Sequence, residues 1–250
     1  MLKELMKKML PKKLVRAIQL YNLHGHMKYA KDGLFTLHNC SFINDADFRK
    51  AYQAGKKTGF WGTEDIEWRI HAALWAAKKA FYLDGDFVEC GVNRGGLSRS
   101  IIEYLDFDKS GKQFFLLDTF ESFDVSLLLD SEKEKYPNAT EWYGKTYEDV
   151  KKTFGRFSNV KIIKGAVPHT LPQVTTEKVA FLSIDMNCVQ PELGALDFFW
   201  PKMVSGGVIV LDDFAYQGFD EQNSAHTEWA KRNKIDILTL PTGQGLIVKP

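Results

Sequence analysis

The 250-residue sequence has little cysteine and no long apolar run. Its three cysteines, Cys40, Cys90 and Cys188, lie far apart. This spacing matches neither a zinc site nor the dense disulfide framework of a small secreted domain. No run of about 18 apolar residues, the length that a membrane-spanning helix needs, occurs in the sequence. We therefore expect a cytoplasmic protein without a transmembrane segment.

An excess of charge of one sign is also lacking, since 33 Lys and Arg residues offset 32 Asp and Glu residues to give a net charge of +1. A near-neutral chain has no global field to attract nucleic acid, so we expect no nucleic-acid partner. The exception is the basic segment 1–16, whose lysines interrupt its apolar residues and so exclude a secretory signal. We expect its apolar helix face to pack in a homodimer, with binding to anionic lipid as the alternative.

The pattern of the chain changes near residue 85. Before that point we expect a helical N-terminal extension, residues 1–57, and the first part of a main domain, residues 58–250. After it, apolar runs alternate with amphipathic segments, which predicts an α/β fold with a seven-stranded, mostly parallel sheet. Only a short turn, Pro241–Gln244, separates the last two runs, so these should form an antiparallel hairpin. The expected strands are 86–90, 113–118, 160–164, 178–184, 206–211, 235–240 and 244–248, and the expected helices are 64–82, 96–105, 145–154, 189–200 and 220–233. The segment 131–135 is interpreted as an exposed loop.

Two strand ends indicate a nucleoside-binding edge. The first run is followed by the glycine-rich turn 91–96, and the second ends in Asp118, which can bond ribose hydroxyls. The turn reads G-x-x-x-G-G instead of the dinucleotide fingerprint G-x-G-x-x-G, and the preceding acid Glu89 suits a cationic cofactor. We therefore predict S-adenosyl-L-methionine as cofactor, with a nicotinamide-dependent oxidoreductase as the alternative. The expected cofactor contacts are Glu89, Cys90, Gly91, Arg94, Gly95, Ser98, Asp118, Thr119, Phe120, Gly165, Ala166 and Asp185.

Three aspartates follow two neighbouring strands of the expected sheet. Asp185 ends one run, and Asp212 and Asp213 end the next. Adjacent parallel strands bring these side chains to one crevice, where a cation would offset their repulsion. Oxygen ligands suit Mg²⁺, which would lower the pKa of a substrate hydroxyl and orient it. The alternative is that Asp212 caps a turn and Asp213 is solvated. His226 is a further candidate general base.

Several motifs extend this interpretation to a known family. F-V-E-C-G-V and R-G-G within 87–96, L-D-T-F-E-S-F at 117–123, T-L-P at 170–172 and W-P-K at 200–202 resemble the macrocin O-methyltransferase family. Over residues 58–250, the resemblance implies a Rossmann-like class I methyltransferase that acts on sugar hydroxyls. It further implies that Asp185, Asp212 and Asp213 bind a divalent metal, with Asp185 also a candidate base. The sequence departs from the family at Asn187, where a second aspartate is usual.

Together these features predict an O-methyltransferase whose acceptor is a hydroxyl of a sugar, glycoside or related small metabolite. A homologue that binds the cofactor without catalysis is a further alternative.

Overall fold

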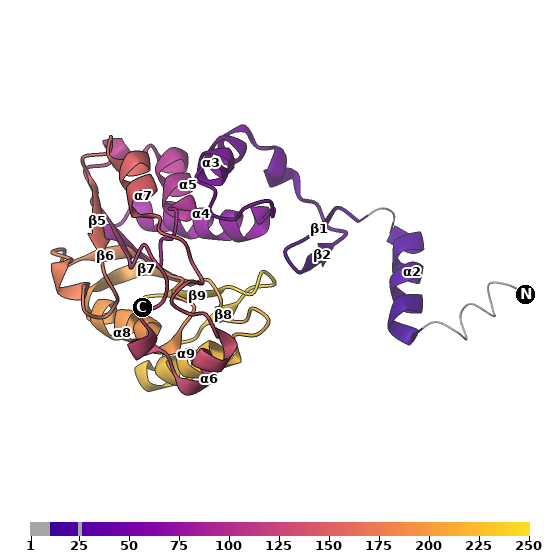
Figure 1. Cartoon of the computed structure of the whole chain (residues 1–250). Coiled ribbons are helices and arrows are strands. Elements are labelled where there is room, and N and C mark those ends of the chain that lie inside the picture. Colours follow the sequence, from indigo (N-terminus) through magenta and orange to yellow (C-terminus); the bar gives the residue numbers. More distant parts are fainter. Residues whose placement is uncertain (1–10, 25–26) are drawn as a thin grey trace, which may run out of the picture.

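A seven-stranded sheet forms the centre of the protein. The computed structural model describes residues 11–24 and 27–250. The strand order is β5-β4-β3-β6-β7-β9-β8, in which β3 to β7 run parallel and β9 pairs antiparallel with both β7 and β8 (Figure 1). This arrangement confirms the predicted α/β fold and its terminal hairpin. The strands are β3 (Asp86–Cys90), β4 (Phe114–Asp118), β5 (Val160–Lys164), β6 (Val179–Ile184), β7 (Met203–Leu211), β8 (Leu238–Thr239) and β9 (Gly245–Val248).

Helices cover both faces of the sheet, because its strands alternate side chains between two apolar clusters. In β3, for example, Phe87 belongs to the cluster under α3, α4, α5 and α7, whereas Val88 belongs to the cluster under α8 and α9. The parallel sheet is thus buried on both sides, which leaves the carboxyl ends of its strands as the place for a site. The helices are α2 (Lys12–His24), α3 (Ala46–Lys56), α4 (Glu67–Phe81), α5 (Gly96–Leu105), α6 (Asp130–Lys135), α7 (Tyr147–Phe154), α8 (Val189–Phe199) and α9 (Asp220–Asn233).

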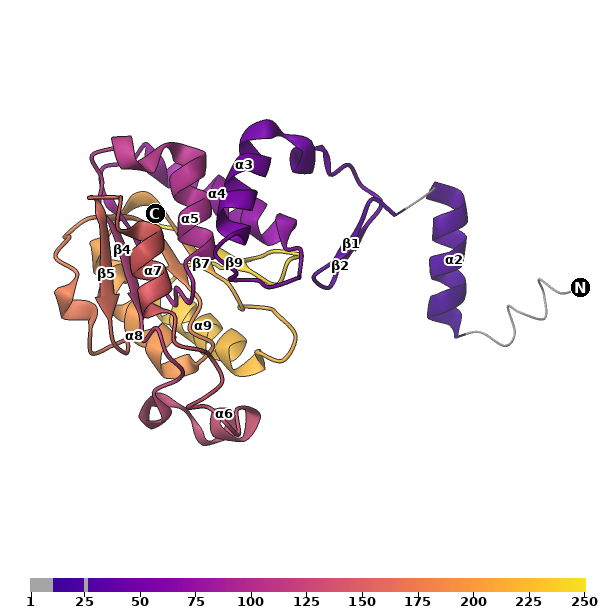
Figure 2. The same ribbon diagram turned by 45° about the horizontal axis from the view of Figure 1, so that its top comes forward.

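The segment interpreted as an exposed loop is instead the short helix α6, so that interpretation was wrong. Its side chain Glu132 is only 2% exposed and accepts hydrogen bonds from the backbone amides of Leu129 (2.8 Å) and Val189 (2.7 Å). The second bond joins α6 to the first residue of α8. Figure 2 shows α6 on the side of the sheet away from α3.

The N-terminal part contains a hairpin that the sequence pattern did not reveal. Strands β1 (Tyr29–Lys31) and β2 (Leu34–Thr36) pair antiparallel around a turn in which Asp32 (φ 50°) and Gly33 (φ 69°) both have positive φ. Both positive angles are those of a type I′ turn. The Tyr29 hydroxyl donates to Glu67 Oε2 (3.0 Å), which attaches the hairpin to the start of α4.

The predicted domain boundary at residue 57 follows directly after α3, which packs against α5 of the main domain. Helix α2 extends away from the sheet in Figures 1 and 2. Residues 1–10, the rest of the expected basic helix, lie outside the described residues.

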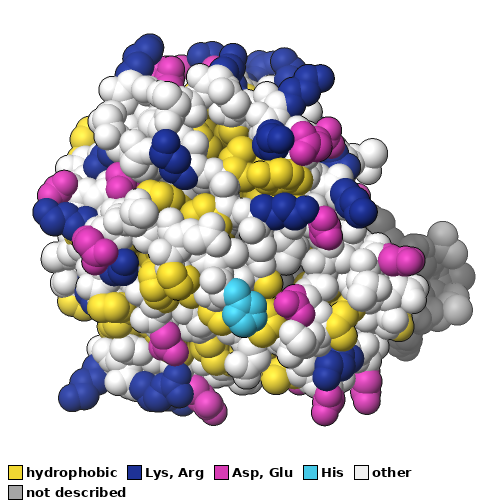
Figure 3. All heavy atoms as spheres, turned by 60° about the vertical axis from the view of Figure 1, so that its left-hand side comes forward, with side chains coloured by type: hydrophobic (Ala, Val, Ile, Leu, Met, Phe, Trp, Pro, Cys, Tyr) yellow, Lys and Arg dark blue, Asp and Glu magenta, His cyan; other side chains and the backbone are white. Residues whose placement is uncertain are grey.

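Charges of both signs are interspersed on the face drawn in Figure 3, with yellow apolar side chains between them. Within the ranges that the structure describes, no helix is both long and apolar enough to cross a bilayer.

Candidate functional site

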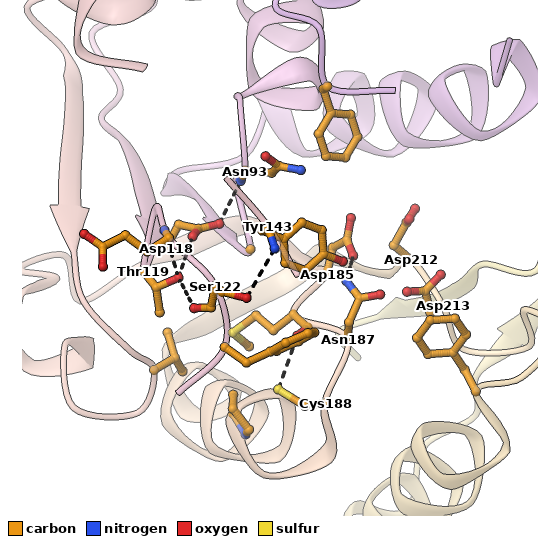
Figure 4. Close-up of a pocket in the computed structure, with 18 of the residues that line it drawn as sticks. Asn93, Asp118, Thr119, Ser122, Tyr143, Asp185, Asn187, Cys188, Asp212 and Asp213 are labelled. Atoms are coloured by element: carbon orange, nitrogen blue, oxygen red, sulfur yellow. Dashed lines mark hydrogen bonds between the residues drawn. The ribbon is translucent and has the colours of Figure 1, made fainter. Parts of the chain in front are cut away.

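A cavity of about 410 Å³ opens at the carboxyl ends of the parallel strands. Figure 4 shows Asn93, Asp118 and Thr119 on one side, Asp212 and Asp213 on the other, and Tyr143 between the two groups. The two sides correspond to the two strand-end patterns in the sequence. The cavity therefore joins the expected nucleoside edge to the expected acidic cluster.

The glycine-rich turn after β3 packs directly on the backbone that follows β6. A Cβ on Gly91 would lie only 1.7 Å from the carbonyl oxygen of Asp185, and Gly91 has a φ of 89°. The Asp185 amide also donates to the Cys90 carbonyl oxygen (2.9 Å). Only glycine fits here, so the turn and the first aspartate of the acidic cluster have fixed relative positions.

The Asp118 carboxylate is hydrogen-bonded to the glycine-rich turn. Its Oδ2 accepts from the backbone amides of Val92 and Asn93, both at 2.7 Å, and its Oδ1 accepts from the Phe120 amide at 2.5 Å. Burial raises the pKa of Asp118, and these three amide donors lower it in part. The Thr119 hydroxyl lies 3.2 Å from Asp118 Oδ1 and 3.0 Å from the Ser122 carbonyl oxygen. Because it has a single proton, it can donate to only one of these two oxygens at a time.

The twelve expected cofactor contacts divide into two groups. Those that line the cavity are Gly91, Asp118, Thr119, Gly165, Ala166 and Asp185. Those outside its lining are Glu89, Cys90, Arg94, Gly95, Ser98 and Phe120. Glu89 is completely buried beneath the turn, and this burial raises its pKa to about 8. Arg94 instead forms an ion pair with Asp149 (3.0 Å).

The three expected metal ligands come together as predicted from the topology. Asp185, Asp212 and Asp213, the carboxylate triad, each offer an oxygen within 4.8 Å of the others. The Asn187 amide donates to Asp185 Oδ1 (3.1 Å), and the Gln244 amide donates to Asp212 Oδ1 (2.9 Å). Burial, followed by the charges of the other two aspartates, raises the pKa of Asp185 well above its ordinary value.

Arg69 of α4, whose side chain is only 13% exposed, already occupies one side of the triad. Its Nη1 lies 3.1 Å from Asp212 Oδ2, and its Nη2 donates to Asp213 Oδ1 at 3.1 Å. Its Nε lies 3.6 Å from Oδ2 of Asp32 in the hairpin turn, and its guanidinium carbon lies 4.5 Å from the ring centre of Tyr216. Burial opposes the charge of Arg69, but the surrounding aspartates raise its pKa above the ordinary value.

The donor set of the triad fits a hard divalent cation. Carboxylate oxygens are the ligands that Mg²⁺ prefers, and three of them converge here from two neighbouring strand ends. Burial is the main cause of the raised pKa of Asp185, and the charges of Asp212 and Asp213 add to it; a bound cation would offset that repulsion.

His226 lies away from the cavity. It is 1% exposed, its Nε2 is 3.1 Å from Glu192 Oε2, and it is not among the cavity-lining residues. Glu192 Oε1 in turn accepts from the Met186 amide (3.1 Å), next to Asp185. The geometry therefore gives His226 a contact that supports the loop after β6, and its catalytic role stays a prediction without a cavity contact.

Arg69 and Asp32 were missed from the sequence, although each left a signal. Arg69 lies three residues after Ile66 and one before Ile70, on the apolar face of α4, where a charge needs a buried partner. Asp32-Gly33 is a typical hairpin dipeptide.

The chain is similar to known O-methyltransferases. Residues 72–238 match the family model described as macrocin-O-methyltransferase (TylF). Over 142 residues, 52% of this chain and 53% of the relative, it is 26% identical to the 8-demethyl-8-(2,3-dimethoxy-alpha-L-rhamnosyl)-tetracenomycin-C 4'-O-methyltransferase of Streptomyces olivaceus. It is 25% identical over 143 residues, 52% of this chain and 55% of the relative, to the mycinamicin III 3''-O-methyltransferase of Micromonospora griseorubida. The chain thus spans about half the length of the curated relatives it matches.

Among solved structures, the O-methyltransferase NovP has a TM-score of 0.61 at 20% identity, covering 72% of this chain and 79% of that chain. At this identity the likeness shows the fold.

Proposed function

The chain belongs to the macrocin O-methyltransferase family, and from that premise we propose that it transfers a methyl group from S-adenosylmethionine to a hydroxyl of a sugar, glycoside or related small metabolite. The observation that carries the proposal is one cavity in which a nucleoside-type strand edge adjoins a carboxylate triad. Both curated relatives are named as O-methyltransferases, one of them of a rhamnosyl compound, which supports a sugar-linked acceptor.

The nucleoside side of the cavity suits the cofactor. Asp118 accepts three backbone amides, which leaves one lone pair for a ribose hydroxyl once Thr119 donates to the Ser122 carbonyl oxygen. Gly165 and Ala166 line the cavity after β5, where small side chains leave room for an adenine ring. The methionine part then passes Gly91, toward the triad.

The proposed reaction is an in-line displacement at the methyl carbon. The acceptor oxygen forms the new O–C bond while the S–C bond of the cofactor breaks, and S-adenosylhomocysteine leaves with the sulfur electron pair. The hydroxyl proton passes to the Asp185 carboxylate, which lines the cavity. Tyr143, between the two sides of the cavity, restricts the path along which the acceptor approaches (Figure 4).

A divalent ion, Mg²⁺ by its ligand preference, completes the proposal. Asp185, Asp212 and Asp213 would hold it, and it would lower the pKa of the acceptor hydroxyl and orient its oxygen. The Asn187 amide donates to Asp185 Oδ1, so Asp185 would offer the ion Oδ2 or the remaining lone pair of Oδ1.

Calorimetric titration with S-adenosylhomocysteine, with NAD⁺ as comparator, tests the cofactor. We expect micromolar binding of S-adenosylhomocysteine and none of NAD⁺; the reverse would make the protein a nicotinamide enzyme. Methyl transfer is then measured with a panel of glycosides, with Mg²⁺ present or chelated. Binding without turnover across the panel would favour the non-catalytic alternative.

The assembly and location are further proposals. Helix α2 exposes the apolar side chains of Leu14 and Ile18, four residues apart on one side, and it extends away from the sheet, which supports a homodimer formed through the N-terminal helices. Light scattering of the full chain and of a variant that lacks residues 1–26 tests this. All three cysteines are free, which suits the cytoplasm.

A further inference from the structure

Arg69 stands between the triad and a carboxylate outside it. We propose that Arg69 is an exchangeable counter-ion: a divalent cation that binds the triad displaces its guanidinium from Asp212 and Asp213 toward Asp32. The proposal rests on the proposed function only in taking the triad as the metal site. Both Arg69 and Asp32 precede residues 72–238, the part that matches the family.

The first argument is competition for the same oxygens. The guanidinium nitrogens lie 3.1 Å from Asp212 Oδ2 and 3.1 Å from Asp213 Oδ1. Gln244 already donates to the other oxygen of Asp212, so an ion that binds Asp212 at Oδ2 shares that oxygen with Arg69. Two cations on one carboxylate oxygen in a buried site repel strongly, because the effective dielectric constant there is low. Binding of the ion therefore requires that the guanidinium move.

The second argument is that a receiving partner is already in place. Arg69 Nε is buried and makes no hydrogen bond with any residue that the structure describes, although Asp32 Oδ2 lies only 3.6 Å from it. The Tyr216 hydroxyl donates to Asp32 Oδ1 (3.1 Å), which fixes the acid, and the Tyr216 ring lies beneath the guanidinium. A small rotation over this ring would give Nε its missing bond.

The third argument is that the hairpin is held firmly enough to serve as that partner. Lys31, next to Asp32, forms ion pairs with Asp65 and Glu67, both at 2.9 Å. Glu67 also accepts from Tyr29 (3.0 Å), and it precedes Arg69 by two residues on α4. The arginine and its second acid are thus attached to the same helix end, so Asp32 acts as a positioning residue for Arg69.

The test measures the affinity of the full chain for Mn²⁺ in the absence of acceptor. The electron paramagnetic resonance signal of free Mn²⁺ reports how much of the ion remains unbound. Arg69→Met keeps the apolar stem and removes the charge, and it should bind Mn²⁺ at least about 10-fold more tightly than the wild type. Asp32→Asn removes the receiving acid and should bind several-fold more weakly. In the Arg69→Met background, Asp32→Asn should change the affinity little, because its effect passes through Arg69.

Two outcomes would overturn the exchange. One is equal or weaker Mn²⁺ binding by Arg69→Met. The other is the same loss from Asp32→Asn in both backgrounds, since that would mean a direct charge effect. Arg99→Met is the matched control, because Arg99 is similarly buried (11% against 13% side-chain exposure) but pairs with Glu103, and its removal should leave Mn²⁺ affinity unchanged.

A folding defect in Arg69→Met does not block the test. Arg69→Lys keeps one charge but not the forked contact to two carboxylates, and it should show an affinity between those of wild type and Arg69→Met. Equal affinity of wild type and Arg69→Lys counts against the exchange. Calorimetry with S-adenosylhomocysteine runs in parallel: if no variant binds Mn²⁺ but all bind S-adenosylhomocysteine, the exchange falls and methyl transfer stands. If neither ligand binds, the proposed function falls with it.

Discussion

The substitution Gly91→Ala should both destabilise the protein and weaken cofactor binding. A Cβ at this position would lie 1.7 Å from the Asp185 carbonyl oxygen and 2.4 Å from its carbon, and backbone cannot rotate away as a side chain can. An alanine at φ 89° also has left-handed backbone strain, which costs about 1–2 kcal/mol. If β3 and β6 separate to relieve the collision, the bond from the Asp185 amide to the Cys90 carbonyl oxygen is lost, at about 1–3 kcal/mol. We therefore expect a loss of roughly 2–5 kcal/mol in the free energy of unfolding.

Gly111→Ala is the matched control for this prediction. Gly111 has a similar φ of 74° but no atom within 4 Å of its virtual Cβ, so only the strain of about 1–2 kcal/mol applies. Urea unfolding of both variants gives the two free energies, and calorimetry gives the affinity for S-adenosylhomocysteine. Gly91→Ala should bind at least about 10-fold more weakly. If it loses no more stability than Gly111→Ala, the close approach of the turn to Asp185 is refuted.

Three further predictions concern buried carboxylates. Asp118→Asn should lower both stability, by about 1–3 kcal/mol, and affinity for S-adenosylhomocysteine, because the amide cannot accept all the backbone bonds that Asp118 accepts; unchanged titration calorimetry would contradict it. Glu132→Gln should cost about 1–3 kcal/mol and speed proteolysis within 124–145, since Gln has one acceptor oxygen for two amide donors and one of the two bonds is lost, whereas Asp130→Asn, at a 98% exposed side chain, should change neither. Burial raises the pKa of Glu89 to about 8, so the folded state binds more protons than the unfolded state between about pH 4.5 and 8. The unfolding free energy of the wild type should therefore fall as pH rises through this range, relative to Glu89→Gln, and parallel curves for the two proteins would argue against a buried neutral carboxyl.

The parallel sheet was predictable because its strands are short apolar runs bounded by glycine or acid. β3 and β6 are buried along almost their whole length, so their composition alone separates them from the amphipathic helices. Strand ends then place Asp118 and the triad by topology, without any knowledge of side-chain packing. The edge strand β8, expected over 235–240, is only Leu238–Thr239, and both of its residues are exposed.

The N-terminal hairpin and α6 could not be recognised in the same way. β1 and β2 have three residues each, too few for an alternating pattern. The α6 sequence D-S-E-K-E-K has no apolar face, and its buried residue is Glu132, which is held by hydrogen bonds instead of apolar contact.

The burial of His226 could not be predicted from the sequence either, because its partner Glu192 lies on another helix. Spacing within α9 predicts which side of that helix a residue occupies, but not which distant carboxylate it meets. The cavity lining depends on such long-range contacts.

The carboxylate of Glu132 has a consequence for redesign of the segment between β4 and α7. Because it bonds to the amide of Val189, the segment between β4 and α7 cannot be exchanged as an independent cassette. A loop transplanted here from a relative would leave the first amide of α8, two residues after Asn187, without its carboxylate partner. The graft avoids this only if it supplies an acid at position 132. Chimeras that keep Glu132 should therefore fold, whereas those that replace it with a residue that cannot accept should lose stability, because the backbone amide of residue 189 stays without its partner.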